Sequence, residues 1–170
     1  SCVEKTANVL EKIGADLVDT WMAVTPQDLE KLIGFRHAVP ESINRIIAER
    51  KRENPTLTKL GTDMAVPDGH MREMWDLYRS SCEDLQLEWC AFGHIGNNHV
   101  HVNILPRNLE ELERGMQLYE IFAQRVVELG GSVSAEHGIG KIKAKFLRYM
   151  FTPEQIDQMR RVKNALDPQR

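Results

Sequence analysis

The strongest constraint on the fold is a pair of strand-forming segments that flank a short polar loop. The segments LEWCAFGHI (87–95) and HVHVNILP (99–106) are separated only by Gly96, Asn97 and Asn98. Segments rich in strand-forming residues joined by so short a loop predict an antiparallel β-hairpin. We therefore expect a sheet built around this hairpin.

Apolar and polar side chains alternate along the second of these segments. Because successive side chains of a strand point to opposite faces, Val100, Val102 and Ile104 are expected to face a core. The opposite face then presents a row of polar side chains: His99, His101 and Asn103. This row is the first candidate for a functional surface.

The remaining segments combine helical patterns with two further strand patterns. We expect strands within 15–24 and 56–67. Apolar spacing, capping signals and glycine stops predict helices over 3–13, 25–34, 38–54, 69–87, 108–129, 141–150 and 152–166. This order predicts a single α+β domain over 1–170, with a mainly antiparallel four-stranded sheet, helices packed on one face and a helical C-terminal third.

Charge and composition narrow the classes of partner. With a net charge of −3, the sequence offers no electrostatic argument for nucleic acid or an anionic membrane. No apolar run approaches the roughly 20 residues that cross a bilayer, so we expect no transmembrane segment. Three cysteines, an odd count, do not make a disulfide framework, so a cytoplasmic protein is expected.

The histidines of the hairpin have two interpretations. His94 ends the first strand and is expected near His99 or His101 across the turn. Imidazoles are good ligands for zinc and similar metals, but a catalytic metal usually needs three protein ligands and an open position. The alternative is a polar sheet face whose imidazoles form local hydrogen bonds. The segment contains no His-Glu-x-x-His motif and no zinc-finger spacing.

A second candidate site is SAEHGIGK (134–141), where a carboxylate and an imidazole are adjacent between helices. Glu136 could be an anionic third metal ligand, and His137 could be a general base. Gly138 and Gly140 would allow unusual backbone angles and close approach of a ligand. The alternative is a turn between helices with a solvated Glu-His pair.

Two basic residues are candidates for binding a carboxylate. Arg36 could bind it in a bidentate manner, and Lys59 could act as a point charge. The alternative is that both belong to a solvated charged face, as the segment ERKREN (49–54) does.

Taken together, the motifs GHIGNNHVHVN (93–103), SAEHGIGK and NALDP (164–168) resemble the C-terminal domain of FAD-linked oxidases of the vanillyl-alcohol oxidase type. The segment KLGTDMAVP (59–67) is similar to the strand that precedes the long helix of that family. The resemblance implies a ferredoxin-like α+β domain. It is greatest to members that oxidise D-lactate, glycolate or D-2-hydroxyglutarate.

The resemblance also implies roles for individual residues. His94, His101 and Glu136 match the ligands of a divalent metal, zinc or manganese, and His137 matches the catalytic base. The residues implied in substrate binding are Asn103, Arg36 and Lys59, of which Lys59 falls only near the position of the matching family lysine.

The loop of the hairpin departs from the family pattern. Asn97, Asn98 and His99 stand where the family has Asp-Gly-Asn. The acidic residue is lost and an imidazole is gained, so the choice of metal and the contacts of the loop with flavin are open. His99 is either a further ligand or a replacement for the asparagine.

The implied function is oxidation of a small D-2-hydroxy acid to the 2-oxo acid, with FAD as cofactor. We see no glycine-rich flavin-binding segment, so we expect a substrate-binding cap domain whose partner is the N-terminal FAD-binding domain of the same parent chain. The fragment alone is expected to be inactive, and a peripheral membrane position through an electron acceptor is compatible with it. Two alternatives remain, a metal-dependent hydrolase and an inert binding fragment.

Overall fold

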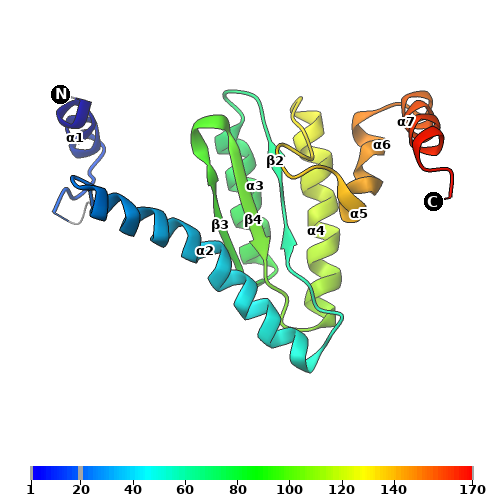
Figure 1. The fold of residues 1–170 in the computed structure, drawn as a ribbon, viewed down its shortest axis with the longest axis horizontal. Coiled ribbons are helices and arrows are strands. Elements are labelled where there is room, and N and C mark those ends of the chain that lie inside the picture. The colour runs from blue at the N-terminus through cyan, green and yellow to red at the C-terminus, as the bar shows by residue number, and fades with distance from the viewer. Residues whose placement is uncertain (1, 19–20, 170) are drawn as a thin grey trace. The chain divides into compact units, whose positions relative to one another are not determined.

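The computed structural model describes residues 2–18 and 21–169. The chain divides into two compact units, Ser1–Arg45 and Ile46–Arg170. The first unit contains α1 (Cys2–Lys12) and the beginning of α2 (Pro26–Glu53). The second contains every strand of the described residues (Figure 1). The expectation of a single domain over 1–170 stays a prediction.

The predicted hairpin is confirmed, and its second strand is the centre of a four-stranded antiparallel sheet. The central strand β4 pairs with β3 along one side, from Trp89↔Ile104 to His94↔His99. Along its other side β4 pairs with β1 and β2. The strands are β1 (Leu60–Gly61), β2 (Met64–Ala65), β3 (Trp89–His94) and β4 (His99–Ile104).

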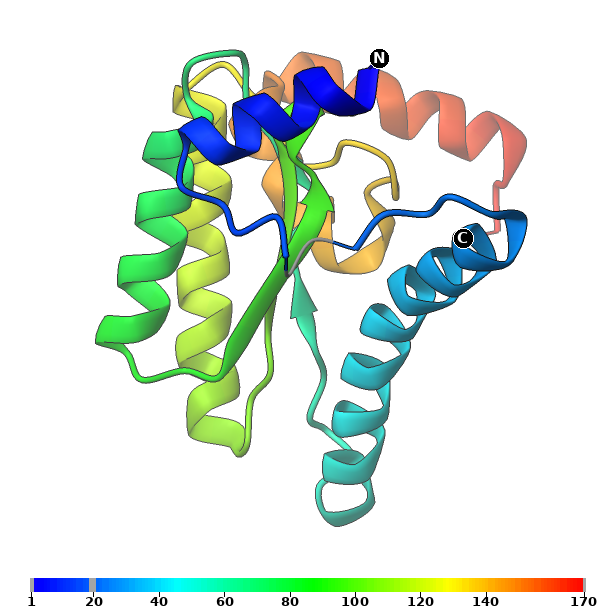
Figure 2. The same cartoon turned by 90° about the vertical axis from the view of Figure 1, so that its left-hand side faces the viewer.

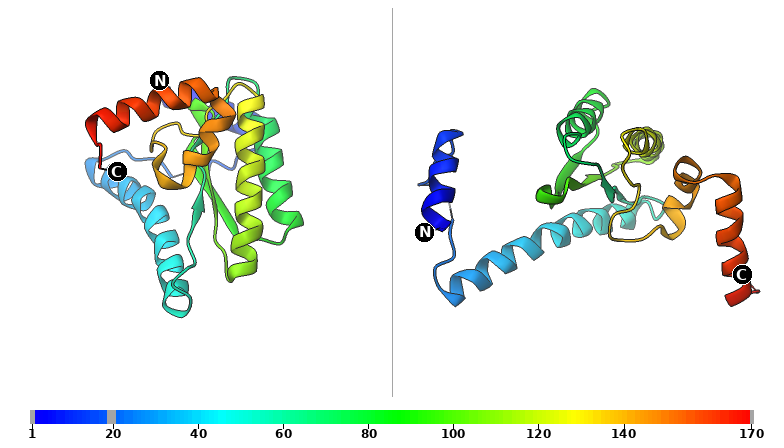
Figure 3. Two further views of the ribbon diagram at one scale, coloured as in Figure 1. Left: turned by 90° about the vertical axis from the view of Figure 1, so that its right-hand side faces the viewer. Right: turned by 90° about the horizontal axis from the view of Figure 1, so that it is seen from above.

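Two long helices cover one face of this sheet, as expected. Figures 2 and 3 show α3 (Met71–Asp84) and α4 (Leu109–Glu128) side by side against it. The apolar side chains of β4 are buried in the core beneath these helices. Tyr78 of α3 and Phe122 of α4 meet there edge to face, with ring centroids 4.7 Å apart.

The C-terminal third is helical, as predicted, and its capping signals are confirmed. The side chain of Asn108 accepts a hydrogen bond from the backbone N–H of Glu111 at the start of α4. Thr152 and Gln155 form a reciprocal capping box. After α4 the structure has α5 (Gly140–Lys143), the 3-10 turn η2 (Ala144–Phe146), α6 (Leu147–Met150) and α7 (Pro153–Leu166).

The strand expected within 15–24 is wrong for the described part of that segment, since 15–18 and 21–24 contain no strand. Asp19 and Thr20 lie outside the described residues. Val18 and Trp21 are exposed. A strand needs a neighbour for its backbone N–H and C=O groups, and every described strand of the sheet comes from 60–104. Strand-forming side chains alone are therefore insufficient here.

The expected stop at Gly34 is also wrong, because α2 runs without a break from Pro26 to Glu53 and includes Pro40. A glycine inside a helix costs about 1 kcal/mol relative to alanine, which neighbouring turns can offset. Of the residues described, none belongs to a helix both long and apolar enough to cross a membrane.

Gly93 permits the close strand pairing that precedes the hairpin turn. A Cβ at this position would lie 2.5 Å from the carbonyl oxygen of His99 and 2.9 Å from the Cα of Val100. Its φ of +156° adds to the preference for glycine. Gly96, inside the turn, has open space where a Cβ would lie.

These two glycines form a matched pair for measurement. We expect Gly93→Ala to lower the free energy of unfolding by about 1–3 kcal/mol, because the backbone of β4 cannot move away. Gly96→Ala is expected to stay within about 0.5 kcal/mol of the wild type. Urea unfolding of the three proteins checks this, and equal losses in both variants would contradict it.

Candidate active site

The polar face of the sheet lies opposite α3 and α4. Register places His94 across from His99 and Phe92 across from His101. His99, His101 and Asn103 are buried although they face away from the core beneath α3 and α4. Strand β4 is therefore buried on both faces, and its polar side chains need internal partners.

The first partner of His101 is Thr62, at a point where the hydrogen-bond ladder between β4 and the segment 60–65 is irregular. The hydroxyl of Thr62, instead of its carbonyl oxygen, accepts the hydrogen bond from the backbone N–H of Val102, at 2.9 Å. The Thr62 carbonyl oxygen instead lies 3.0 Å from Nδ1 of His101. Because a carbonyl oxygen only accepts, Nδ1 of His101 carries the proton in this bond. The other ring nitrogen, Nε2, then faces the loop 132–137.

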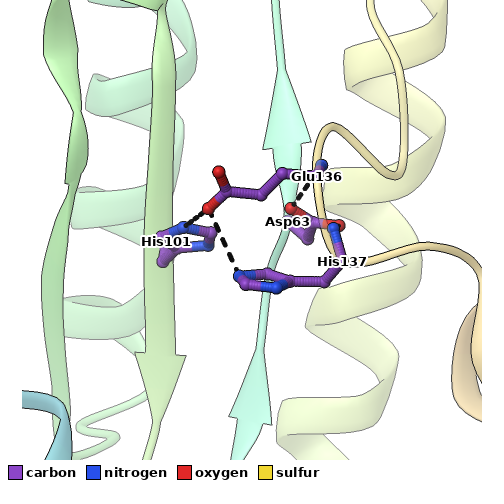
Figure 4. Close-up of side chains that lie close together, drawn as sticks. All are labelled: Asp63, His101, Glu136 and His137. Carbon is purple, nitrogen blue, oxygen red and sulfur yellow. Dashed lines mark hydrogen bonds and ion pairs between the residues drawn. The ribbon is translucent and has the colours of Figure 1, made fainter.

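Figure 4 shows the Glu136 carboxylate between the imidazoles of His101 and His137, and a third imidazole, His94, also contacts it. Its Oε1 lies 2.9 Å from Nε2 of His101 and 3.3 Å from Nε2 of His137. Its Oε2 lies 3.7 Å from Nε2 of His94. The structure thus brings together four predicted site residues from the hairpin and from a distant loop.

The loop that carries Glu136 and His137 is fixed by a buried carboxylate, Asp63. Its Oδ2 accepts hydrogen bonds from the Lys143 ammonium at 2.7 Å, the Ser134 hydroxyl at 2.8 Å and the backbone N–H of His137 at 3.0 Å. Its Oδ1 accepts one from the backbone N–H of Glu136 at 3.2 Å. A fifth partner of Asp63 is His99, whose Nε2 lies 3.1 Å from Oδ1.

These contacts perturb the ionisation of the groups around Asp63. Burial opposes charge on Asp63, but hydrogen bonds from Lys143, Ser134 and the two loop amides hold its pKa well below the usual range. Desolvation likewise opposes charge on Glu136, yet the contact with Nε2 of His101 and the other nearby imidazoles lower its pKa. Both carboxylates are therefore anionic at neutral pH.

His99 has a different environment from the other imidazoles. Burial first, and the neighbouring His101 second, lower the pKa of His99, while Asp63 and Glu136 oppose this shift. Its ring centroid lies 4.4 Å from that of His101. His99 therefore belongs to the buried layer beneath the site.

The donor set around Glu136 fits a divalent cation. The Nδ1–H of His101 is bonded to Thr62, so Nε2 of a neutral His101 would carry a lone pair directed at the Glu136 oxygen. The repulsion between this lone pair and the carboxylate is relieved only by a cation or a second proton between them. Ligand atoms about 2.1 Å from a tetrahedral zinc ion lie about 3.4 Å apart. The 2.9 and 3.7 Å separations of His101 and His94 from Glu136 bracket this value.

One described group of potential metal ligands, with ligand atoms within 4.8 Å of one another, is Asp63, His101, Glu136 and His137. Asp63 is a poor candidate within it, because its two oxygens already accept five hydrogen bonds. His137 is 65% exposed at its side chain, whereas that of His101 is 10% exposed. His137 is therefore the more accessible imidazole, and His101 the more constrained one.

The three predicted substrate-binding residues differ in burial and in their described contacts. Asn103 is buried on the polar face, where its amide donates to the carbonyl oxygen of His101 at 3.3 Å. Lys59 is half-buried; burial lowers its pKa, and nearby Cys90, which pairs across the sheet with Asn103, opposes this. Arg36 is exposed on α2 in the first compact unit. A role for these three residues stays a prediction.

The sequence interpretation missed Asp63, Ser134 and Lys143. Asp63 and Ser134 lie inside the quoted motifs, and Asp63 is the one acid in the strand segment 56–67. The signal that could have identified Asp63 was a charged residue within a segment whose neighbours are buried. Lys143, 80 positions along the chain from Asp63, offered no comparable signal.

Comparison with known proteins identifies a family over nearly the whole chain. Residues 2–170 match the family described as FAD linked oxidases, C-terminal domain. The relatives include D-lactate dehydrogenase of Archaeoglobus fulgidus, 29% identical over 97% of this chain and 34% of its own length. They also include glycolate oxidase subunit GlcD of Bacillus subtilis, 30% identical over 94% of this chain and 33% of its own length.

A third relative is D-2-hydroxyglutarate dehydrogenase of Stutzerimonas stutzeri, 28% identical over 89% of this chain and 32% of its own length. The chain thus spans about a third of the length of these relatives. Two of these three relatives are named dehydrogenases and one is named an oxidase subunit.

The lowered pKa of Asp63 has a consequence for stability. A carboxyl whose pKa is lower in the folded state stabilises that state above the unfolded pKa, about 3.9, and loses this contribution as pH falls toward the folded value. We expect Asp63→Asn to cost about 3–5 kcal/mol at pH 7, because Lys143 is left buried without its counter-charge. The cost should shrink below about pH 4.

Urea unfolding between pH 3 and pH 7 checks this expectation. Asp76→Asn is the control, since Asp76 is exposed and its ion pair with Arg79 is 4.0 Å long. Its effect is expected to stay within about 0.5 kcal/mol. A cost of Asp63→Asn that did not change with pH would contradict the assignment of an ionised carboxylate.

Proposed function

The chain belongs to the family of FAD linked oxidases, C-terminal domain, and we propose that it is the substrate-binding cap domain of an FAD-dependent oxidoreductase. The substrate proposed is a small D-2-hydroxy acid of the lactate, glycolate or 2-hydroxyglutarate type, oxidised to the 2-oxo acid. The proposed partner is the N-terminal FAD-binding domain of the parent protein. By itself the cap domain is expected to be inactive.

The observation that carries this proposal is the position of Glu136 among His94, His101 and His137. The arrangement joins a carboxylate and two imidazoles suited to a divalent metal with an exposed imidazole suited to proton transfer. We propose His94, His101 and Glu136 as the metal ligands, with zinc or manganese as the metal. The bound metal would supply Lewis acidity toward the substrate hydroxyl, and bound FAD would supply the two-electron acceptor.

The residues of this chain bind the substrate and move a proton. His137 accepts the hydroxyl proton, for which its exposed side chain is accessible. Glu136 stabilises the imidazolium that results, because its carboxylate stays anionic. Asn103 offers a carboxamide for a polar group of the substrate, and Lys59 offers a positive charge for its carboxylate. Arg36 is proposed as a further carboxylate-binding residue from the resemblance alone.

We propose a cytoplasmic location, with peripheral membrane association through an electron-acceptor partner. Cys2, Cys82 and Cys90 are free thiols. Free thiols suit a reducing compartment.

Removing the base tests the mechanism in the full-length protein. We expect His137→Ala to lower turnover of a D-2-hydroxy acid by about 10²–10⁴-fold, with flavin content unchanged because His137 is not assigned to flavin binding. His70→Ala is the control, since the His70 side chain is 43% exposed and its ion pair in the described part of the chain is with Glu73, at the start of α3. Unchanged turnover in His137→Ala would show that the base is wrongly assigned.

Metal analysis tests the proposed ligands separately from turnover. We expect His94→Ala and Glu136→Gln to reduce bound metal in the purified full-length protein, since each removes one of three ligands. His70→Ala should retain the wild-type content. The ligand assignment fails if all three variants carry the same amount of metal as the wild type.

A further inference from the structure

The family pattern does not expect the imidazole of His99, and the structure gives it a partner other than a metal. Nε2 of His99 lies 3.1 Å from Oδ1 of Asp63, and both side chains are buried. Asp63 also takes hydrogen bonds from the Lys143 ammonium and from two backbone N–H groups, so its carboxylate acts as an acceptor. Nε2 of His99 therefore donates to Asp63.

The two oxygens of Asp63 divide their partners in a regular way. Oδ1 binds the imidazole of His99 and the backbone N–H of Glu136. Oδ2 binds Lys143, Ser134 and the backbone N–H of His137. Each oxygen thus joins side-chain donors to the backbone of one site residue.

We propose that His99 is a positioning residue that acts through Asp63, and that it is not a further metal ligand. We call Asp63, His99, Ser134 and Lys143 the Asp63 clamp. His99 fixes Oδ1 and hence the backbone of Glu136. Lys143 and Ser134 fix Oδ2 and hence the backbone of His137. The inference rests on the proposed function only for the roles of the two residues so positioned.

Charge and burial favour this role. Lys143 is buried and compensates the charge of Asp63. The imidazole of His99 then completes the hydrogen bonding of Oδ1, beside the backbone N–H of Glu136. Among the described residues, the imidazoles with a ring nitrogen within 4.0 Å of the Glu136 carboxylate are His94, His101 and His137, and His99 is not among them.

Hydrogen exchange of the backbone amides in the flavin-loaded full-length protein tests the clamp. His99→Gln keeps an N–H donor of similar reach, whereas His99→Leu removes it. We expect the Glu136 amide to exchange about 10-fold faster in His99→Leu and at nearly the wild-type rate in His99→Gln. Lys143→Met should instead accelerate mainly the His137 amide. Thermal unfolding of each variant shows whether it is folded.

Titration with Zn²⁺ alone, on the same variants, separates the two roles of His99. We expect His99→Leu to bind Zn²⁺ about 10–100-fold more weakly with unchanged stoichiometry, and His99→Gln to bind it nearly as the wild type does. Equal loss of affinity in both variants with unchanged amide exchange would make His99 a ligand. The clamp would be overturned if the amides exchanged at the same rate in the wild type, His99→Leu and Lys143→Met. It would also be overturned if His99→Gln and His99→Leu accelerated exchange equally.

Failure of the proposed function would appear elsewhere. If His94→Ala and His137→Ala leave metal content and turnover unchanged, the site is wrongly assigned. The exchange of the Glu136 and His137 amides still decides whether Asp63 positions them.

Discussion

The arrangement of the site depends on the buried carboxylate of Asp63. It takes hydrogen bonds from an ammonium, a hydroxyl, an imidazole and two backbone amides. Isolated in a protein interior, a carboxylate would be costly, but one so fully bonded is stable as an anion. Its donors come from a strand and from the segment 134–143. The need of this one carboxylate for hydrogen-bond donors therefore holds the segment with Glu136 and His137 against the sheet.

Local pattern was sufficient to predict the hairpin and its two faces. Alternation along His99–Ile104 fixes which side chains face the core, because a strand has a period of two. The capping signals at Asn108 and Thr152 are equally local. The segment 15–24 shows the limit of this reasoning, since strand formation also requires a pairing partner that no local pattern supplies.

The candidate site needed more than local pattern. Periodicity placed His99 and His101 on one face but could not distinguish them. The difference comes from tertiary contacts, with Thr62 and Glu136 for His101 and with Asp63 for His99. The contact of Glu136 with the hairpin was expected only from the motifs of the resemblance. Glu136 lies 35 positions from His101 along the chain, so no local periodicity predicts that the two side chains meet.

Burial of β4 on both faces has a consequence for how the protein loses function on heating. The same strand supplies core side chains to one face and candidate site side chains to the other. Loosening of His101 or Asn103 thus requires separation of strands that also hold the core, which is a global event and not local fraying. Inactivation and loss of native structure should then share one activation barrier, so the half-life of activity at high temperature would report the unfolding rate of the sheet.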